Sequence, residues 1–192
     1  VAPSRGFGTH PHRNMEIFSY VLDGMLEHKD TAGNAGRIVP GDVQMISAGA
    51  GIAHSEFNGS DRDSVHFLQI WLLPAVADTP PGYQQRHFPS SEKRGRLRPI
   101  VTPDGADGSI RIRQDARVLA GLFDGPESAT LTLVGDRHAY VHVARGEITV
   151  NGQRLGAGDG LKLRHVDAVS LSQGHDAEVL VFDLRPVETD FY

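Results

Sequence analysis

The chain has 192 residues, with 19 Lys and Arg against 24 Asp and Glu, a formal net charge of -5 and no Cys. The absence of Cys excludes a disulfide framework, a thiol nucleophile and Cys-ligated metal sites, so any metal must bind His, Asp, Glu or backbone oxygen. A mildly acidic chain without Lys/Arg blocks also lacks the charge pattern of a direct nucleic-acid binder, and no apolar segment is long enough to span a membrane. The composition therefore indicates a soluble globular protein, with the cytoplasm as the expected compartment.

The first part of the chain consists of short segments that are rich in β-branched and aromatic residues. Turn-forming residues, such as Asp23-Gly24 and Pro40–Asp42, separate these segments. The segments predicted to be strands are Met15–Leu22, Leu26–His28, Gly36–Val39, Val43–Ile46 and Val65–Leu73. Strands at this spacing predict a sandwich or barrel.

The second part repeats this style. Its predicted strands are Tyr140–Val143, Glu147–Val150, Val166–Leu171 and Ala177–Asp183. The glycines Gly24 and Gly146 each sit between two strand segments, so each half is predicted to contain a hairpin followed by a Gly-Asp turn. The sequence thus predicts a duplicated β-domain, with a polar connecting segment and a boundary near Arg96, giving domains 1–95 and 96–192.

Two motifs place possible metal ligands at i, i+2 spacing: H-P-H at 10–12 and H-S-E at 54–56. In an extended strand, residues two apart point to the same face, so each motif presents two ligands side by side. Two such strands facing each other would gather three imidazoles and one carboxylate. That donor set suits Fe(II), Ni, Cu, Mn or Zn, and four protein ligands leave two positions of an octahedral metal open. A single strand histidine is usually exposed or hydrogen-bonded, so the joint placement of the motifs carries this hypothesis.

Longer stretches around these motifs resemble the pirin family of bicupins, in particular its bacterial members. They are G-F-G-T-H-P-H-R-N-M-E-I-F-S-Y-V-L-D-G-M-L-E-H-K-D at 6–30 and V-P-G-D-V-Q-M-I-S-A-G-A-G-I-A-H-S-E-F-N at 39–58. The segments at 66–71 and 92–97 and the weaker second copy extend the resemblance over about the whole chain. The resemblance implies an all-β bicupin of two tandem jelly-roll barrels. It also implies further residues ahead of Val1 that supply strands of the first barrel.

The resemblance assigns the metal ligands His10, His12, His54 and Glu56 in the N-terminal domain, and it implies a degenerate C-terminal domain without a metal site. Iron(II) is the expected metal, with Ni, Cu, Mn, Zn or Co as alternatives. General cupins bind metal through the residue matched here by Glu16, so an exchange of ligands stays open. Glu16 lies at an even spacing from His12, which predicts that it points inwards; Glu56 or Glu16 is the expected catalytic base. The histidines of the second copy are expected to be structural or exposed: His138, His142 and His165.

For bacterial pirins the resemblance implies quercetin 2,3-dioxygenase activity, in which dioxygen opens the flavonol heterocycle and carbon monoxide leaves. The expected partners are a flavonol or a similar aromatic hydroxyketone and O₂, without nucleic acid or membrane, in a monomer. Apolar and aromatic residues of the first copy could wall the substrate: Met15, Phe18, Met45, Phe67 and Trp71. Two alternatives have the same fold: a metal-binding, redox-responsive regulator acting through protein partners, and a metal-free structural bicupin.

Overall fold

The computed structural model describes residues 1–186, and nearly all of its regular structure is β-strand, which confirms the all-β fold class. The chain forms two compact units. Unit 1 comprises Val1–Phe88 and Ile110–Gln114, and unit 2 comprises Pro89–Ser109 and the residues from Asp115 onwards. A single boundary near Arg96 stays a prediction. No helix in the described part of the chain is long and apolar enough to cross a membrane.

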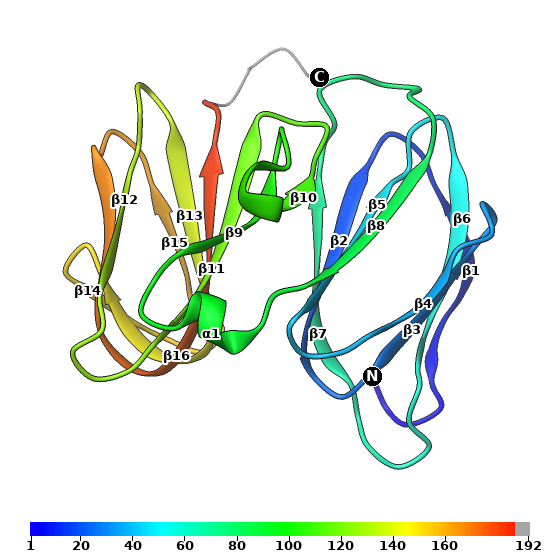
Figure 1. The fold of residues 1–192 in the computed structure, drawn as a ribbon, viewed down its shortest axis with the longest axis horizontal. Helices are drawn as coiled ribbons and strands as arrows, with labels where there is room; N and C mark the ends of the chain where they lie inside the picture. Colours follow the sequence, from blue (N-terminus) through cyan, green and yellow to red (C-terminus); the bar gives the residue numbers. More distant parts are fainter. Residues whose placement is uncertain (187–192) are drawn as a thin grey trace. The chain divides into compact units, whose positions relative to one another are not determined.

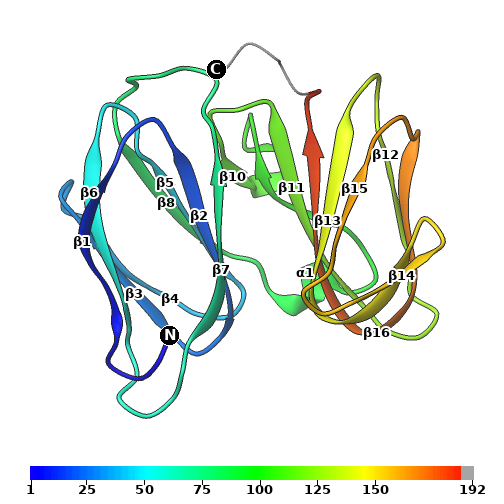
Figure 2. The ribbon, with the colours of Figure 1, turned by 180° about the vertical axis from the view of Figure 1, so that it is seen from behind.

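Unit 1 is built from two four-stranded antiparallel sheets, with strand orders β1-β6-β3-β4 and β7-β2-β5-β8. Figures 1 and 2 show these blue to green strands as two layers that face each other. The strands of these two sheets are β1 (Gly6–His12), β2 (Glu16–Asp23), β3 (Leu26–Asp30), β4 (Ala35–Ile38), β5 (Asp42–Ser47), β6 (Ile52–Asn58), β7 (His66–Leu72) and β8 (Gly82–His87). Unit 1 also contains the short β10 (Ile110–Arg111), which is in neither sheet. The strand predictions for this half are confirmed to within about two residues at each end.

Alternation along β2 decides which side chains of unit 1 lie between the sheets. Ile17 packs in a cluster with Ile46 and Ile52, and Val21 packs in a second cluster with Leu26. Because residues two apart on a strand share a face, Ser19 points between the sheets with Ile17 and Val21. Glu16, Phe18 and Tyr20 therefore belong to the opposite face of β2.

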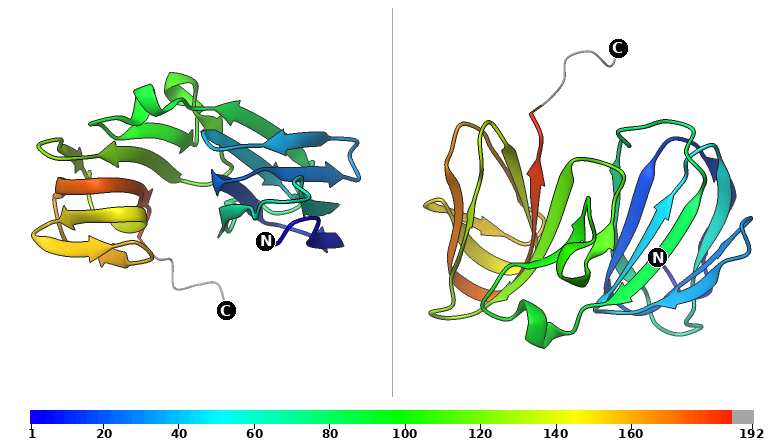
Figure 3. Two further views of the ribbon diagram at one scale, coloured as in Figure 1. Left: turned by 90° about the horizontal axis from the view of Figure 1, so that it is seen from below. Right: turned by 45° about the horizontal axis from the view of Figure 1, so that its top comes forward.

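Unit 2 is an antiparallel sheet in which two long, bent strands carry most of the pairing. Its central order is β9-β11-β16-β13-β14, with β12 paired to β16 and β15 paired to β13. The elements are the helix α1 (Ser90–Lys93), β9 (Arg98–Thr102), the short helix η1 (Ala106–Gly108), β11 (Ala116–Phe123), β12 (Ala129–Thr132), β13 (His138–Val150), β14 (Gln153–Gly156), β15 (Gly160–Leu163) and β16 (Ala168–Leu184). Figure 3 shows the bent course of the last strands of this unit, β13 to β16, in yellow to red.

The predicted hairpins at Gly24 and Gly146 are wrong. Gly24 lies where the chain passes from β2 in one sheet to β3 in the other, and Gly146 lies inside β13, where the pairing with β16 shifts register. Both glycines have positive φ, and a Cβ would meet a backbone carbonyl oxygen, 2.7 Å away at Gly24 and closer at Gly146. The repeated glycine therefore marks a corner where the chain bends, which only a residue without Cβ fits.

Candidate metal centre

Three histidines from two neighbouring strands form the core of the candidate site. His10 pairs directly with His54 across β1 and β6, and His12 lies two residues along from His10 on the same face. The ring centroids lie 4.5 Å apart for His10 and His54, 4.8 Å for His10 and His12, and 4.9 Å for His12 and His54. The sequence suggested that the two motifs face each other from opposing strands. The structure instead places them side by side on adjacent strands of one sheet.

Backbone and side-chain contacts direct the imidazole nitrogens of these histidines. The Nδ1 of His10 lies 2.7 Å from the Gly8 carbonyl oxygen, so it donates its proton there and Nε2 keeps the lone pair. The Nε2 atoms of His12 and His54 are 3.0 Å apart. The ligand atoms of all three histidines lie within 4.8 Å of one another. Three nitrogens therefore converge at a distance that one cation can span.

The protein environment keeps the inner histidines neutral. Burial is the main cause that lowers the pKa of His54 from 6.5 to about 4, and the nearby His10, His12 and His28 lower it further. Burial and His10 also lower the pKa of His12. A neutral imidazole carries the lone pair that a metal needs, so at neutral pH these rings are ready to act as ligands.

Glu56 lies in the same interior and is held by the opposite sheet. The Gln69 amide donates to Oε2 at 2.5 Å, and the Ser19 hydroxyl donates to Oε1 at 3.4 Å. Burial raises the pKa of Glu56, although these two hydrogen bonds counteract the rise. The Glu56 carboxylate, His54 and His28 have possible ligand atoms within 4.8 Å of one another. This second group shares His54 with the group of three histidines. The structure thus places His10, His12 and His54 in one group and Glu56 in a second group with His54 and His28, so the assignment of one four-ligand site stays a prediction.

His28 is the residue of this site that sequence reasoning missed. It lies on β3 directly opposite Glu56 on β6, and it is 1% exposed. Its Nε2 lies 3.1 Å from Asp30 Oδ2, while its buried Nδ1 has no hydrogen-bond partner among the described residues. Burial acts to raise the pKa of Asp30, but hydrogen bonds from Asn34 and His28 outweigh it and lower that pKa. The ionised Asp30 therefore accepts a hydrogen bond from Nε2–H of His28, and the buried Nδ1 is the nitrogen of His28 left for a ligand. The i, i+2 spacing of His28 and Asp30 is the signal that could have found this pair.

A polar row on the opposite sheet faces the histidines and was also missed. Ser19 on β2 is the direct cross-strand neighbour of Gln44 on β5 and of Gln69 on β7. Cross-strand neighbours point to the same face, so the three side chains line one side of the interior. Only the pairing of the strands assembles this row, because the three residues are far apart in the sequence.

Glu16 lies away from this cluster. Its Oε2 accepts the Ser47 hydroxyl at 2.8 Å and the Arg113 backbone N–H at 3.2 Å, on the face of β2 opposite to Ser19. The even spacing from His12 fails as a guide because a turn at Arg13–Met15 separates β1 from β2, so alternation restarts. Among the described residues, the structure therefore does not bring Glu16 into either metal-ligating group.

Of the five residues that the sequence suggested for a substrate wall, four lie in or against the buried core and one is exposed. Phe18 and Met45 are fully buried on the face of their sheet away from the histidines, and Met15 and Phe67 pack against core clusters. Trp71 is 51% exposed, and its ring meets the His12 ring edge-on at a centroid distance of 5.0 Å. Gln69, two residues before it and on the same face, is exposed as well. The interior of unit 1 is thus open to solvent along β7, next to the histidines.

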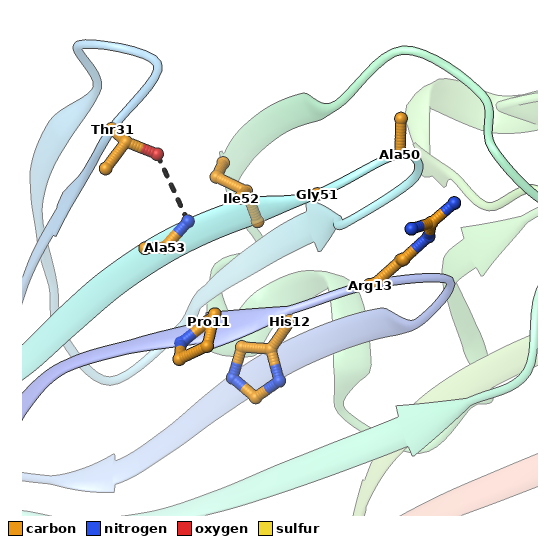
Figure 4. A pocket seen from close by; sticks show the side chains of 8 residues that line it. All are labelled: Pro11, His12, Arg13, Thr31, Ala50, Gly51, Ile52 and Ala53. Atoms are coloured by element: carbon orange, nitrogen blue, oxygen red, sulfur yellow. Dashed lines mark hydrogen bonds between the residues drawn. The ribbon is translucent and has the colours of Figure 1, made fainter.

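A cavity of about 450 Å³ borders His12 at the end of β1. Figure 4 shows the His12 ring pointing away from Thr31 and Ala53, which are joined by a hydrogen bond from the Ala53 N–H to the Thr31 hydroxyl. The other lining residues are Pro11, Arg13, Ala50, Gly51 and Ile52. This cavity touches the cluster at His12 alone.

The donor set fits a divalent transition metal. Imidazole and carboxylate suit Fe, Ni, Cu, Mn and Zn, and the chain has no Cys to supply a thiolate ligand. Two buried imidazole nitrogens, His54 Nδ1 and His28 Nδ1, have no partner within the described residues, although buried polar atoms are normally satisfied. The histidines of unit 2 enter no such group in the part of the chain that the structure describes.

Comparisons with known proteins agree with this geometry. Residues 1–72 match the family model described as Pirin, and residues 99–184 match the model of the quercetinase C-terminal cupin domain. Quercetin 2,3-dioxygenase of Escherichia coli strain K12 is 37% identical over 97% of this chain and 80% of its own length. The pirin-like protein of Caulobacter vibrioides is 38% identical over 95% of this chain and 79% of its own length.

The crystal structure of the bacterial pirin YhhW from Escherichia coli in complex with nickel(II) superposes with a TM-score of 0.91. That protein is 37% identical, and the match covers 97% of this chain and 80% of the other. The similarity over both units confirms the bicupin architecture.

Proposed function

The chain belongs to the pirin family, and we propose that it is a metal-dependent dioxygenase that opens the heterocyclic ring of quercetin-like flavonols with O₂ and releases carbon monoxide. The observation that carries this proposal is the convergence of His10, His12 and His54 in the interior of unit 1, next to a second group in which Glu56 joins His54 and His28. The relatives named quercetin 2,3-dioxygenase and the nickel complex of a bacterial pirin support it.

His10, His12, His54 and Glu56 would hold one divalent metal, with iron(II) as the first candidate and nickel next. When bound, the metal would supply Lewis acidity that lowers the pKa of a flavonol hydroxyl, together with open positions for substrate and dioxygen. The neutral state of His12 and His54 favours binding, because no proton has to leave these rings at neutral pH.

Glu56 is the proposed base for the flavonol hydroxyl. Gln69 holds its Oε2, whereas Oε1 has only the long contact with Ser19, so Oε1 is the atom free to accept a proton. Burial raises the pKa of Glu56, which brings a carboxyl group closer to the pKa that a base needs at neutral pH. His28 lies opposite Glu56 and keeps the carboxylate surrounded by polar groups.

Trp71 is the proposed platform for the substrate. Its half-exposed indole lies beside His12 at the open side of the interior, where a flat aromatic ring can stack on it. A flavonol stacked on this indole would lie next to the His12 ring.

The test is oxygen uptake and carbon monoxide release when quercetin is added to protein loaded anaerobically with Fe(II), Ni(II), Cu(II) or Mn(II). We expect metal-dependent turnover that is lost in the double variant His10→Ala/His12→Ala and kept in the matched control His138→Ala. Stoichiometric metal without oxygen uptake would reject the dioxygenase and favour a metal-binding regulator. Protein that binds none of the four metals would reject both and favour a structural bicupin.

Glu56→Gln and Glu16→Gln compare the two carboxylates that the sequence offered. We expect Glu56→Gln to lose turnover and most of the metal, and Glu16→Gln to keep both, because the Glu16 carboxylate contacts Ser47 and the Arg113 backbone. Loss of metal in Glu16→Gln, with metal retained in Glu56→Gln, would instead assign Glu16 as the carboxylate ligand, as in general cupins.

A further inference from the structure

His28 is a buried side chain of unit 1 that the proposed ligand set of the metal does not include. It lies on β3, and its side chain and that of Asp30 are both fully buried. Across β3 and β6, His28 pairs with Glu56 and Asp30 pairs with His54. His28 and His54 are therefore diagonal neighbours on one face of the sheet, where aromatic side chains of such neighbours can meet.

Two contacts fix the ring of His28. The Tyr83 ring stacks on it, with centroids 5.1 Å apart and planes inclined by 24°. Its Nε2 lies 3.1 Å from Asp30 Oδ2. An ionised carboxylate can only accept a hydrogen bond, so Nε2 carries the proton of the neutral His28 ring and Nδ1 keeps the lone pair. Asp30 thereby makes the Nδ1 of His28 a hydrogen-bond acceptor.

His54 has the complementary requirement. Its Nε2 lies 3.0 Å from the Nε2 of His12, so Nε2 is the nitrogen that it turns towards the metal centre. The proton of the neutral ring then sits on Nδ1, which is buried and has no hydrogen-bond partner among the described residues. A histidine that binds a metal almost always donates its other N–H to an acceptor in the protein or to a water. The Nδ1–H of His54 therefore needs an acceptor.

The nitrogen atoms of His28 and His54 that lack partners are close to each other. The Nδ1 of His28 is also buried without a hydrogen-bond partner within residues 1–186. The two ring centroids are 5.4 Å apart, with planes inclined by 52°, and one possible ligand atom of each ring lies within 4.8 Å of the other. Glu56 cannot satisfy the lone pair of His28, because an ionised carboxylate has no proton to donate. A buried N–H and a buried lone pair are thus neighbours in the same interior.

We propose that His28 positions His54 as a metal ligand by accepting a hydrogen bond from its Nδ1–H, in a chain that runs from Asp30 through His28 to His54. This chain fixes the tautomer of both rings and directs the Nε2 lone pair of His54 at the metal centre. The inference rests on the metal centre of the proposed function, but not on the reaction at that centre.

The experiment is a competition titration of the full metal-free chain with zinc(II) against a chromophoric chelator. His28→Phe keeps an aromatic ring beside Tyr83 but removes the acceptor, and we expect it to lower zinc affinity about ten- to hundredfold. His28→Gln supplies a carbonyl oxygen as acceptor and should restore most of that affinity, which a purely steric role of the ring would not explain. The matched control is His87→Phe, which removes another imidazole–carboxylate pair of unit 1, with Asp42, and should leave zinc affinity unchanged.

A second measurement uses the wild-type chain and so does not depend on how the variants fold. Long-range proton–nitrogen correlation spectra of the zinc(II)-loaded protein report which nitrogen of each imidazole carries the proton. We expect the proton of His54 on Nδ1 and that of His28 on Nε2. A His28 ring protonated on Nδ1 would overturn the proposal.

Unchanged zinc affinity in His28→Phe would also overturn the proposal, as would a His28→Gln variant that binds zinc no better than His28→Phe. A wild-type chain without zinc affinity would overturn this role of His28 together with the metal centre. If zinc affinity falls in His28→Phe while no metal supports oxygen uptake, the dioxygenase is rejected and the role of His28 stands.

Discussion

Unit 1 and unit 2 are both antiparallel β-structures, yet they bury different kinds of side chain. In unit 2, Val141 and Val143 on β13 lie opposite Val181 and Val179 on β16, in a cluster that is apolar throughout. In unit 1, strand neighbours in the interior are His10 with His54, Glu56 with His28, and Ser19 with two glutamines. The apolar cluster of unit 2 shows that paired strands of this kind can pack without buried histidines between them.

The difference has a thermodynamic meaning. Burying imidazole, carboxylate and amide groups costs free energy unless each finds a partner, and several atoms in unit 1 have none among the described residues. A protein retains such groups when they serve a ligand, because the fold alone would be more stable with apolar residues there. The buried polar side chains of unit 1 therefore lower its stability but provide possible ligands, whereas the buried cluster of unit 2 is apolar.

The largest expected effect is the loss of metal from unit 1. His10→Ala and His12→Ala should each lower metal affinity by more than about hundredfold, because they remove ligands and not merely the groups that orient them. The double variant should be little worse than either single one, since both act on one ion. Metal content after gel filtration measures this, with His142→Ala in unit 2 as the control. Metal retained by the double variant would refute the site.

The next effect concerns the apolar core of unit 2. Phe123 is fully buried there, so Phe123→Ala should lower the free energy of unfolding by about 3–5 kcal/mol. Urea unfolding followed by circular dichroism measures this change. Val134→Ala, at a residue 78% exposed, should change the stability by less than about 0.5 kcal/mol. An unchanged midpoint in Phe123→Ala would show that unit 2 does not depend on this core.

The third prediction exchanges a polar interior residue of unit 1 for an apolar one. Gln44 is 1% exposed, and its amide forms no hydrogen bond of good geometry with a described residue, only a weaker contact with Tyr83. Gln44→Met should therefore stabilise the metal-free protein by about 0.5–2 kcal/mol. The chain has a single Trp, Trp71 in unit 1, so its fluorescence during urea unfolding reports this unit. The exposed Gln153→Met is the control, and a destabilised Gln44→Met would reveal a partner for the amide.

The last prediction concerns the acid sensitivity of metal-free unit 1. The pKa of His54 is about 4 in the fold and 6.5 without the burial that lowers it. Between these values the unfolded chain binds the proton and the folded chain does not, so the free energy of unfolding falls as pH drops from about 6.5 to about 4. Trp71 fluorescence in urea at several pH values measures this slope. His54→Gln should make it shallower, and an equal slope in both proteins would contradict the prediction.

The sequence determined much of this molecule through local rules. Short β-branched segments between glycine turns predicted the strands of unit 1, because alternation and turn chemistry act over a few residues. The i, i+2 spacing in H-P-H and H-S-E placed His10 with His12, and His54 with Glu56, on common faces for the same reason. Gly24 and Gly146 marked equivalent points of the two halves, although the pattern could not tell a hairpin from a corner.

Tertiary structure decided everything that depends on which strands become neighbours. His28 faces Glu56 only because β3 pairs with β6, and Ser19 meets Gln44 and Gln69 only through the pairing of β2 with β5 and β7. Glu16 turned to the other face because alternation does not continue through the turn before β2. Strand register joins residues distant in the chain, and its energy comes from burying whole faces together, so no local spacing could reveal it.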